Sequence, residues 1–286
     1  MKPYLLFSAC LLMTACATRN DKVSLKEFDT MLSGEFKADQ PGGSVLVRKG
    51  DSIVFLKSYG LADLETKEKI TENTLFNLGS VSKTFVSNGI LILNDDGQLS
   101  LEDNLSQYFG DFKNSDIAGK VRIKHLLSHT SGLPDIRNVS ANFDFFLTAK
   151  DEENFAPIKL ADSLNFEPGE KFEYSNPAFN GLALIIEKVT GQPWQKFVSD
   201  SILAPAGMLT SKITDGPYPE AGVAHAYSLK NGRYTEDDYG EFPTFAAAGN
   251  GGVWSSVMEL AAYEQAMERN TFLGKKLTDE SRRIFQ

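Results

Sequence analysis

The chain has 286 residues, of which 42% are hydrophobic and 23% are charged, an ordinary globular composition that suffices for one large domain or two small ones. A formal net charge of -9 argues against a nucleic-acid partner. Three histidines and two cysteines leave no cluster with the spacing of metal ligands, so we expect no structural or catalytic metal.

The N-terminus has the pattern of a targeting segment. A basic tip, an apolar run at residues 4–13 and small residues up to Ala17 predict a signal peptide of the lipoprotein type over residues 1–16. The four residues that end at Cys16 resemble the lipobox of bacterial lipoproteins, whose cysteine becomes the lipidated first residue; ordinary cleavage after Ala17 is the alternative. We therefore expect export to the bacterial periplasm, with a lipid anchor at Cys16 as the membrane attachment and a polar tether over residues 17–24.

A helix and a β-hairpin are predicted next. Apolar residues recur at helical spacing over residues 25–36, and Pro41 with two glycines ends this amphipathic helix. Strand-like runs at residues 44–47 and 53–56, joined by a turn at residues 49–51, predict the hairpin. Two adjacent strands cannot bury both of their faces stably alone, so we expect that partners of this sheet are missing.

Ser80 and Lys83 lie three residues apart at the predicted start of a helix whose apolar side runs from Phe85 to Leu93. Residues i and i+3 share a helix face, so the hydroxyl and the amine can meet. A desolvated lysine with a lowered pKa can take the proton of a serine nucleophile. The alternative is a capping serine beside a solvated lysine, because Ser-x-x-Lys also arises by chance.

The rest of the chain predicts a mostly helical middle and a final helix. These segments are a helix at residues 121–127, an irregular Phe-rich lid or insertion at 138–165, an apolar helix at 179–189 capped by Gly191, a hairpin turn at 231–232, a glycine-rich segment at 249–252 and a helix at 256–267.

Tyr174 and Asn176 form a second candidate group before the helix at residues 179–189. In an extended stretch, residues i and i+2 point the same way, so both side chains can face one cleft. A phenol beside an ammonium has a lowered pKa and can shuttle protons, and an asparagine amide can bind a substrate amide. A tyrosine that only packs the loop is the alternative for Tyr174.

Three motifs together resemble the serine β-lactamase and penicillin-binding-protein superfamily, in its class C β-lactamase-related branch. They are Ser80-Val81-Ser82-Lys83, Tyr174-Ser175-Asn176 and the segment at residues 124–133, and the resemblance runs from about residue 28 to residue 267. It implies an α+β fold of the β-lactamase/transpeptidase type, with an antiparallel sheet flanked by helices and a mostly helical insertion.

The resemblance also implies the roles of the residues. Ser80 is the nucleophile that forms an acyl-enzyme, Lys83 and Tyr174 share its proton, and Asn176 holds the amide of the substrate. The Ser80 backbone N–H donates to the oxyanion. The implied protein is a monomeric serine hydrolase without a cofactor, which acts on a small molecule or peptide: a β-lactam, a D-amino-acid peptide or a small ester.

One element of the superfamily is not found in its expected place. The third motif, Lys-Thr-Gly or His-x-Gly on a late strand, matches only residues 230–232, which precede the glycine-rich segment and suit a plain turn. We therefore expect the domain at residues 25–286 to be incomplete at its C-terminus. Loss of one oxyanion donor typically costs about 10²–10³ in rate. A non-catalytic or inactive lipoprotein that retains the cleft for binding is thus the alternative function.

Two other readings of the reactive residues are disfavoured. His125 and His129 suggest a Ser-His triad, but their segment is typical of a helix end and turn, which favours a structural role. No Gly-x-Ser-x-Gly occurs in the chain, which disfavours an α/β-hydrolase esterase.

Overall fold

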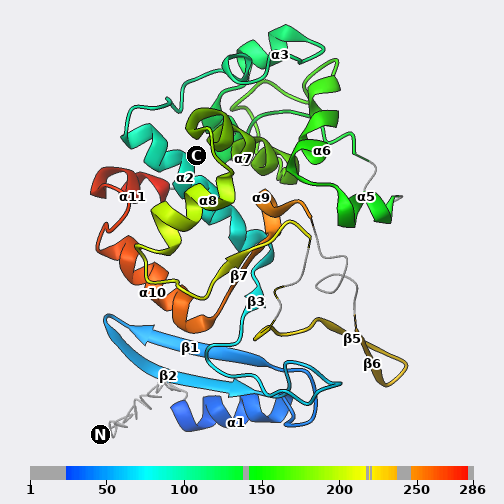
Figure 1. Cartoon of the computed structure of the whole chain (residues 1–286), viewed down its shortest axis with the longest axis vertical. Coiled ribbons are helices and arrows are strands. Elements are labelled where there is room, and N and C mark those ends of the chain that lie inside the picture. Colours follow the sequence, from blue (N-terminus) through cyan, green and yellow to red (C-terminus); the bar gives the residue numbers. More distant parts are fainter. Residues whose placement is uncertain (1–23, 138–141, 217–218, 220, 237–245, 283–286) are drawn as a thin grey trace, which may run out of the picture. The chain divides into compact units, whose positions relative to one another are not determined.

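The computed structural model describes residues 24–137, 142–216, 219, 221–236 and 246–282 (Figure 1). The predicted signal peptide, nearly all of the tether and Cys16 lie outside these residues. The chain divides into a short N-terminal unit, residues 1–35, and a main unit, residues 36–286.

The N-terminal unit contains α1 (Leu25–Glu35), which confirms the helix predicted over residues 25–36. Its start is capped in both directions. The Ser24 hydroxyl accepts from the Glu27 backbone N–H at 3.2 Å, and the Glu27 carboxylate accepts from the Ser24 N–H at 2.8 Å.

The predicted hairpin opens the main unit. Strands β1 (Gly43–Lys49) and β2 (Ser52–Tyr59) pair antiparallel, and Gly50 turns between them at a φ of 55°. The register shifts after Val47, where a bulge bends the ladder. Both strands are longer than predicted, because the pairing continues through residues that the apolar pattern does not mark.

Two further antiparallel sheets are small. The central one has the order β3 (Phe76–Asn77), β7 (Val253–Ser255) and β4 (Lys212–Ile213). The other is the hairpin of β5 (Tyr227–Lys230) and β6 (Arg233–Glu236). Its turn has Asn231 and Gly232 at φ values of 52° and 76°, so residues 230–232 form the tight turn that the sequence predicts.

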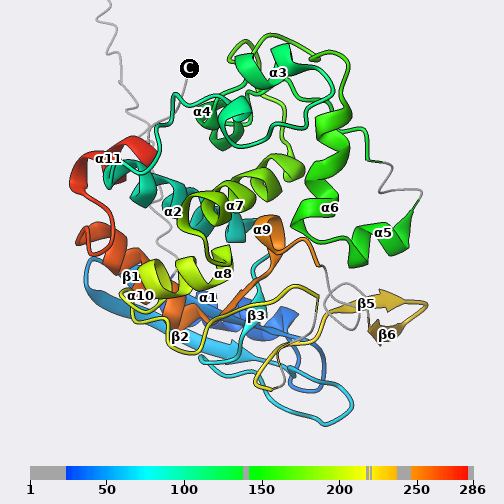
Figure 2. The same ribbon diagram turned by 45° about the horizontal axis from the view of Figure 1, so that its top comes forward.

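Helices hold more of the described residues of the main unit than strands do. α7 (Asn176–Thr190) contacts both α2 (Lys83–Asp95) and α6 (Asp151–Phe155), and Figure 2 shows it between them. The other helices are α3 (Ser115–Lys120), α4 (Ile123–Leu127), α5 (Phe143–Thr148), α8 (Trp194–Val198), α9 (Ala248–Gly251), α10 (Val257–Glu268) and α11 (Lys275–Ser281). Three 3-10 turns at Gly79–Ser82, Leu105–Gln107 and Ala156–Leu160, and one π turn at Ser199–Leu203, complete the set in the described ranges.

The predicted helices are confirmed with small shifts of their ends. α7 begins three residues earlier than predicted, because the Ser175 side chain caps it by accepting from Ala178 N and Pro177 fits its first turn. It ends as predicted at Gly191, whose φ is 70°. The predicted insertion at residues 138–165 is divided into α5, α6 and a 3-10 turn; residues 138–141 are outside the described part.

The central helices pack closely because two of their residues have no side chain. A Cβ built on Gly181 of α7 would lie 2.5 Å from the Phe155 ring of α6. On α2, a Cβ on Gly89 would lie 2.9 Å from Ile186 Cδ1. Glycine at these positions therefore lets α7 approach α6 and α2. The resulting core holds fully buried side chains that include Phe85, Phe155, Leu182, Ile185 and Trp194.

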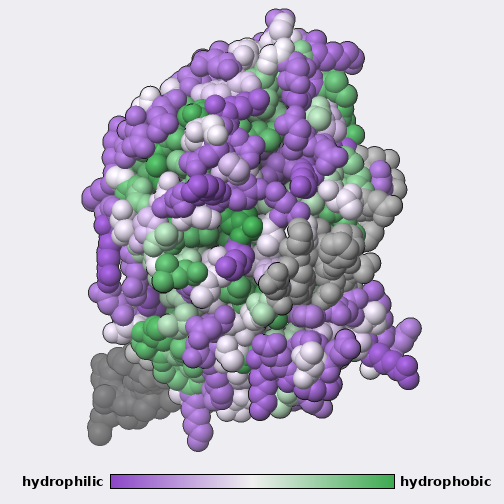
Figure 3. Space-filling model, viewed as in Figure 1, coloured by the Kyte–Doolittle hydropathy of each residue, from purple (hydrophilic) through white to green (hydrophobic). Residues whose placement is uncertain are grey.

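The face of the molecule seen in Figure 3 is mainly hydrophilic, with hydrophobic side chains in separate patches. Among the residues described, no helix has both the length and the apolar character needed to cross a membrane.

Candidate active site

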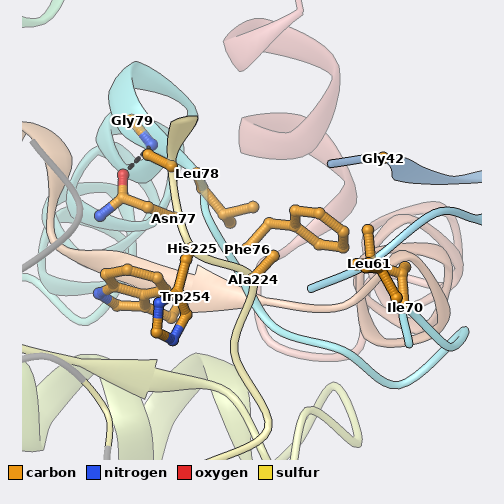
Figure 4. Close-up of a pocket in the computed structure, with 11 residues that line it drawn as sticks. Gly42, Leu61, Ile70, Phe76, Asn77, Leu78, Gly79, Ala224, His225 and Trp254 are labelled. Carbon is orange, nitrogen blue, oxygen red and sulfur yellow. Dashed lines mark hydrogen bonds between the residues drawn. The ribbon is translucent and has the colours of Figure 1, made fainter. Parts of the chain in front are cut away.

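The turn that carries Ser80 connects β3 to α2. Gly79 precedes the serine at a φ of 49°, and its N–H donates to Asn77 Oδ1 at 2.8 Å, which fixes the exit from the strand (Figure 4). Ser80 then lies in a 3-10 turn, and Lys83 is the first residue of α2. In a 3-10 turn, residues i and i+3 lie one above the other, so this local structure brings the two side chains together.

The Lys83 amine lies in the interior with two hydrogen-bond partners. Nζ is 3.2 Å from Ser80 Oγ and 2.8 Å from the carbonyl oxygen of Asn250. Lys83 is 5% exposed, and burial lowers its pKa against the opposing effect of Tyr174. More of this lysine is therefore neutral, and able to accept a proton, than in an exposed lysine.

Tyr174 contacts the same serine from the segment that precedes α7. Its phenol OH lies 2.8 Å from Ser80 Oγ, and its ring centroid is 5.2 Å from Lys83 Nζ. Burial alone would raise the pKa of Tyr174, but hydrogen bonds to Lys83 and Ser80 and the Lys83 charge outweigh it and lower the pKa. The structure thus brings Ser80, Lys83 and Tyr174 together, as the sequence predicts.

Asn176 begins α7 and is half-buried. The backbone of Ser175, between it and Tyr174, is extended, with φ and ψ of -130° and 112°, as predicted. Within the described part of the chain, no hydrogen bond joins the Asn176 amide to another residue.

His129 holds the backbone on both sides of Tyr174. Its carbonyl oxygen accepts from Glu173 N at 2.8 Å and its Nδ1 accepts from Ser175 N at 3.1 Å. Its ring packs against the Tyr174 ring at 4.4 Å between centroids. Burial and the Lys83 charge lower the His129 pKa to about 4, so the ring is neutral at neutral pH and Nδ1 can accept. His129 supports Tyr174; these bonds give it no contact with the serine hydroxyl.

Three polar residues behind Lys83 were not predicted from the sequence. Asn250 follows the glycine at position 249 in α9, and its amide donates to Asn180 Oδ1 at 2.9 Å. Asn180 in turn donates to Asp151 Oδ1 at 2.6 Å. The glycine-rich pattern at residues 249–252 was the available signal, but nothing local connects it with Asp151 or Asn180.

A hollow lies beside the turn that carries Ser80. Its volume is about 360 Å³, and its lining residues are Gly42, Leu61, Ile70, Phe76, Asn77, Leu78, Gly79, Ala224, His225, Ala226 and Trp254 (Figure 4). A second hollow of about 330 Å³ shares Gly42, Phe76 and Leu78 with it and extends along Ser44, Ser255 and Leu260. The space between β1 and the small central sheet is therefore open and lined mainly by apolar side chains.

The antiparallel sheets, the helical body and the Ser-Lys-Tyr group define a protein of the β-lactamase/transpeptidase-like fold. The match with a family model extends this conclusion to the sequence. Residues 28–283 match the model described as Beta-lactamase, and the chain belongs to this family.

Individual relatives agree with this assignment. The chain is 30% identical over 263 residues to penicillin-binding protein 4* of Bacillus subtilis (strain 168), an alignment that covers 87% of this chain and 57% of the relative. It superimposes on a penicillin-binding protein from Bacillus halodurans with a TM-score of 0.75 at 26% identity, covering 87% of this chain and 75% of that one. A D-amino acid amidase from Ochrobactrum anthropi SV3, at 23% identity, TM-score 0.71 and coverage of 88% and 73%, shares the fold. The chain thus spans little more than half the length of its Bacillus subtilis relative.

Proposed function

We propose that the protein is a serine hydrolase that forms an acyl-enzyme on Ser80 and cleaves an amide or an ester. The observation that carries the proposal is the position of Ser80 Oγ, 3.2 Å from Lys83 Nζ and 2.8 Å from the Tyr174 hydroxyl. Two groups whose pKa values are both lowered thus flank one hydroxyl, and either can take part in moving its proton.

The reaction has two steps. In the first, Ser80 Oγ forms a bond to the carbonyl carbon, its proton passes to the Lys83–Tyr174 pair, and the bond to the leaving group breaks as the pair returns that proton to it. The Ser80 backbone N–H donates to the oxyanion. In the second step, water attacks the ester, the same pair takes a proton from the water, and Ser80 regains a proton as the acid product leaves.

The substrate lies on the exposed side of this group. Tyr174 is 49% exposed, and the neighbouring Phe172 is 69% exposed, so this side of the site is open to solvent. The Asn176 amide can donate to and accept from an amide of the substrate. We expect a β-lactam, a D-amino-acid peptide or a small ester, bound without a cofactor or metal.

Covalent labelling tests the proposal. The protein is incubated with a fluorescent fluorophosphonate and, separately, with a fluorescent penicillin, and the labelled residue is identified by peptide mapping. Label on Ser80 that is absent from Ser80→Ala, but unchanged in a Ser106→Ala control at an exposed serine, supports an acyl-enzyme. If neither probe labels Ser80, while a substrate analogue still binds, the cleft serves binding alone.

We also propose that the protein is exported and held at the membrane by lipid on Cys16. The predicted lipobox supports this proposal. Metabolic labelling with an alkyne fatty acid tests it: the wild-type chain takes up the label and sediments with membranes, and Cys16→Ala does neither. Equal labelling of both chains contradicts it.

A further inference from the structure

A buried carboxyl group lies behind the proposed active site. Asp151 begins α6 and is 6% exposed. Its Oδ1 accepts from Asn180 Nδ2 at 2.6 Å and from Gly249 N at 2.9 Å, and its Oδ2 accepts from Trp194 Nε1 at 2.9 Å. Among the described residues, no cation forms a salt bridge with it.

Burial of the Asp151 carboxyl group costs free energy of folding, which indicates that the group has a role other than stability. Burial raises the pKa of Asp151 to about 7, although the N–H donors lower it. All three of its hydrogen-bond partners are donors, so the set suits a carboxylate and offers no acceptor for the proton of a carboxylic acid. Burial of a carboxyl group that forms no salt bridge with a described residue costs free energy.

The contacts of Asp151 lead to Lys83 through two neighbouring residues. One contact is direct, to the backbone N–H of Gly249. The other runs through Asn180, whose Oδ1 accepts from the Asn250 amide at 2.9 Å. The carbonyl oxygen of Asn250 then accepts from Lys83 Nζ at 2.8 Å. The Asp151 carboxyl group is therefore linked to both Gly249 and Asn250, and the carbonyl oxygen of Asn250 accepts from Lys83.

The approach of this segment depends on glycine. A Cβ built on Gly249 would lie 3.0 Å from Asp151 Oδ1, 2.8 Å from the Ala183 Cβ and 3.2 Å from the carbonyl oxygen of Phe179. A side chain there would push α9 away from the carboxyl. Glycine at this position and the carboxyl together set where the Asn250 carbonyl lies.

We infer that Asp151 is a positioning residue for Lys83, because it fixes residues 249 and 250 so that the Asn250 carbonyl directs the lysine amine toward Ser80. A neutral amine has one lone pair, and an N–H donated to Asn250 leaves that lone pair free to face the serine hydroxyl. The position of Lys83 follows from the contacts alone; its consequence for acylation rests on the proposed function.

The test is the titration of Lys83 in the whole protein, followed by NMR of ¹³Cε-labelled lysine and assigned by the signal missing from Lys83→Arg. In Asp151→Asn, the NH₂ must face one of the donors, and even when the amide oxygen still faces Asn180 and Gly249, both bonds weaken because the acceptor has lost its charge. We expect the Lys83 pKa to fall by about one unit relative to wild type, because the ammonium loses its aligned acceptor. The rate of fluorophosphonate labelling falls at least about tenfold through the loss of alignment.

Two further variants separate positioning from stability. Asn180→Leu removes the link to Asn250 but keeps the shape of the core, so it shifts the Lys83 titration in the same direction, and its effect does not add to that of Asp151→Asn. The Asn180→Leu variant also tests the inference if Asp151→Asn does not fold. Trp194→Phe removes the donor on the other oxygen, so it lowers the melting temperature and leaves the Lys83 titration in place.

An unchanged Lys83 titration in folded Asp151→Asn or Asn180→Leu overturns the inference, whatever the labelling rate. A shift in Trp194→Phe equal to that in Asp151→Asn also overturns it, because general loosening would then explain both. If Lys83 shifts as expected but wild-type Ser80 takes no label, the positioning role stands and the proposed function fails.

Discussion

The residues proposed for chemistry and the β1–β2 hairpin differ sharply in how they are supported. Lys83 is 5% exposed among helices whose core side chains are fully buried. In the hairpin, Ile53 and Val54 are 42% and 39% exposed, and β1 forms its ladder with β2 alone among the described strands. Strand β1 contacts α10, and Arg48 of β1 forms a bidentate ion pair with Glu268 of α10, in which both N–O distances are 2.8 Å. The Lys83 amine therefore depends on the helical packing, whereas the hairpin keeps apolar side chains partly exposed.

The largest expected effect tests whether the buried amine of Lys83 lowers the stability of the helical body. Lys83→Met keeps the length of the side chain and removes the buried amine. Labelling of Ser80 should fall by about 10³-fold or more, because the serine loses its base. The free energy of unfolding should stay equal or rise, because a buried polar group is replaced by an apolar one. Quenched time courses measure the labelling rate, and urea unfolding measures the free energy of unfolding. A large loss of stability contradicts the prediction.

A matched pair of truncations compares the two regions directly. Leu182→Ala removes a fully buried side chain of α7 and should cost about 2–5 kcal/mol in the free energy of unfolding. Val54→Ala in the exposed part of β2 should cost less than about 1 kcal/mol. Urea unfolding of both variants measures the difference. Equal costs would show that the hairpin is covered in solution.

Tyr174→Phe separates the phenol from its ring. The variant keeps the packing against His129 but loses the hydroxyl 2.8 Å from Ser80 Oγ. Labelling should slow by about 10²-fold, within the range for removal of one proton-transfer group. The unfolding free energy should change by less than about 1 kcal/mol, because the ring remains and the hydroxyl lies at the exposed side. A labelling rate equal to wild type contradicts a role for the phenol.

Acid should destabilise the protein through His129, which supports Tyr174. The His129 pKa is lowered from 6.5 to about 4, so the unfolded chain binds more protons between these values and stability falls as the pH falls through this window. In His129→Asn, the amide oxygen replaces Nδ1 and does not titrate. The loss between pH 7 and pH 4.5 should be smaller in the variant by about 1–2 kcal/mol, with allowance for partial exposure.

The informative quantity is the difference in stability between wild type and His129→Asn, because the titration of Asp151 changes the stability of both proteins with pH in the direction opposite to that of His129. Its pKa is raised to about 7, so its contribution to stability is present at low pH and is lost as the pH rises through 7. Both proteins share this term. Parallel stability curves for wild type and His129→Asn would contradict the assignment to His129.

The smallest effect concerns the ion pair that joins the hairpin to α10. Arg48→Met should lower the unfolding free energy slightly, and less in 1 M salt, because Glu268 is half exposed and salt screens the pair. Labelling of Ser80 should not change. A double-mutant cycle with Glu268→Gln measures the pair. A change in the labelling rate would show that the hairpin and the site are coupled.

The sequence predicted the parts of the site that have local spacing. Ser80 and Lys83 are one turn apart, and Tyr174 and Asn176 flank one extended residue. The contact of Tyr174 with Ser80, 94 residues away, followed from the family resemblance and not from spacing. The end of α7 was predicted from its glycine cap at Gly191, whereas its start at the Ser175 cap was missed by three residues. Asp151 was missed because its three partners are 29, 43 and 98 residues away along the chain, and no spacing rule links side chains that meet only in the fold.

The contact between Lys83 and the carbonyl of Asn250 joins residues that are 167 positions apart, and Tyr174 lies 94 positions after Ser80. Contacts of such long range form late in folding, after the entropy of closing a long loop has been overcome. During synthesis, the serine leaves the ribosome long before the segment that orients its base. On the proposed function, the growing chain therefore holds Ser80 and Lys83 before Tyr174 and Asn250 have been made, and acylation begins only once these segments have packed together.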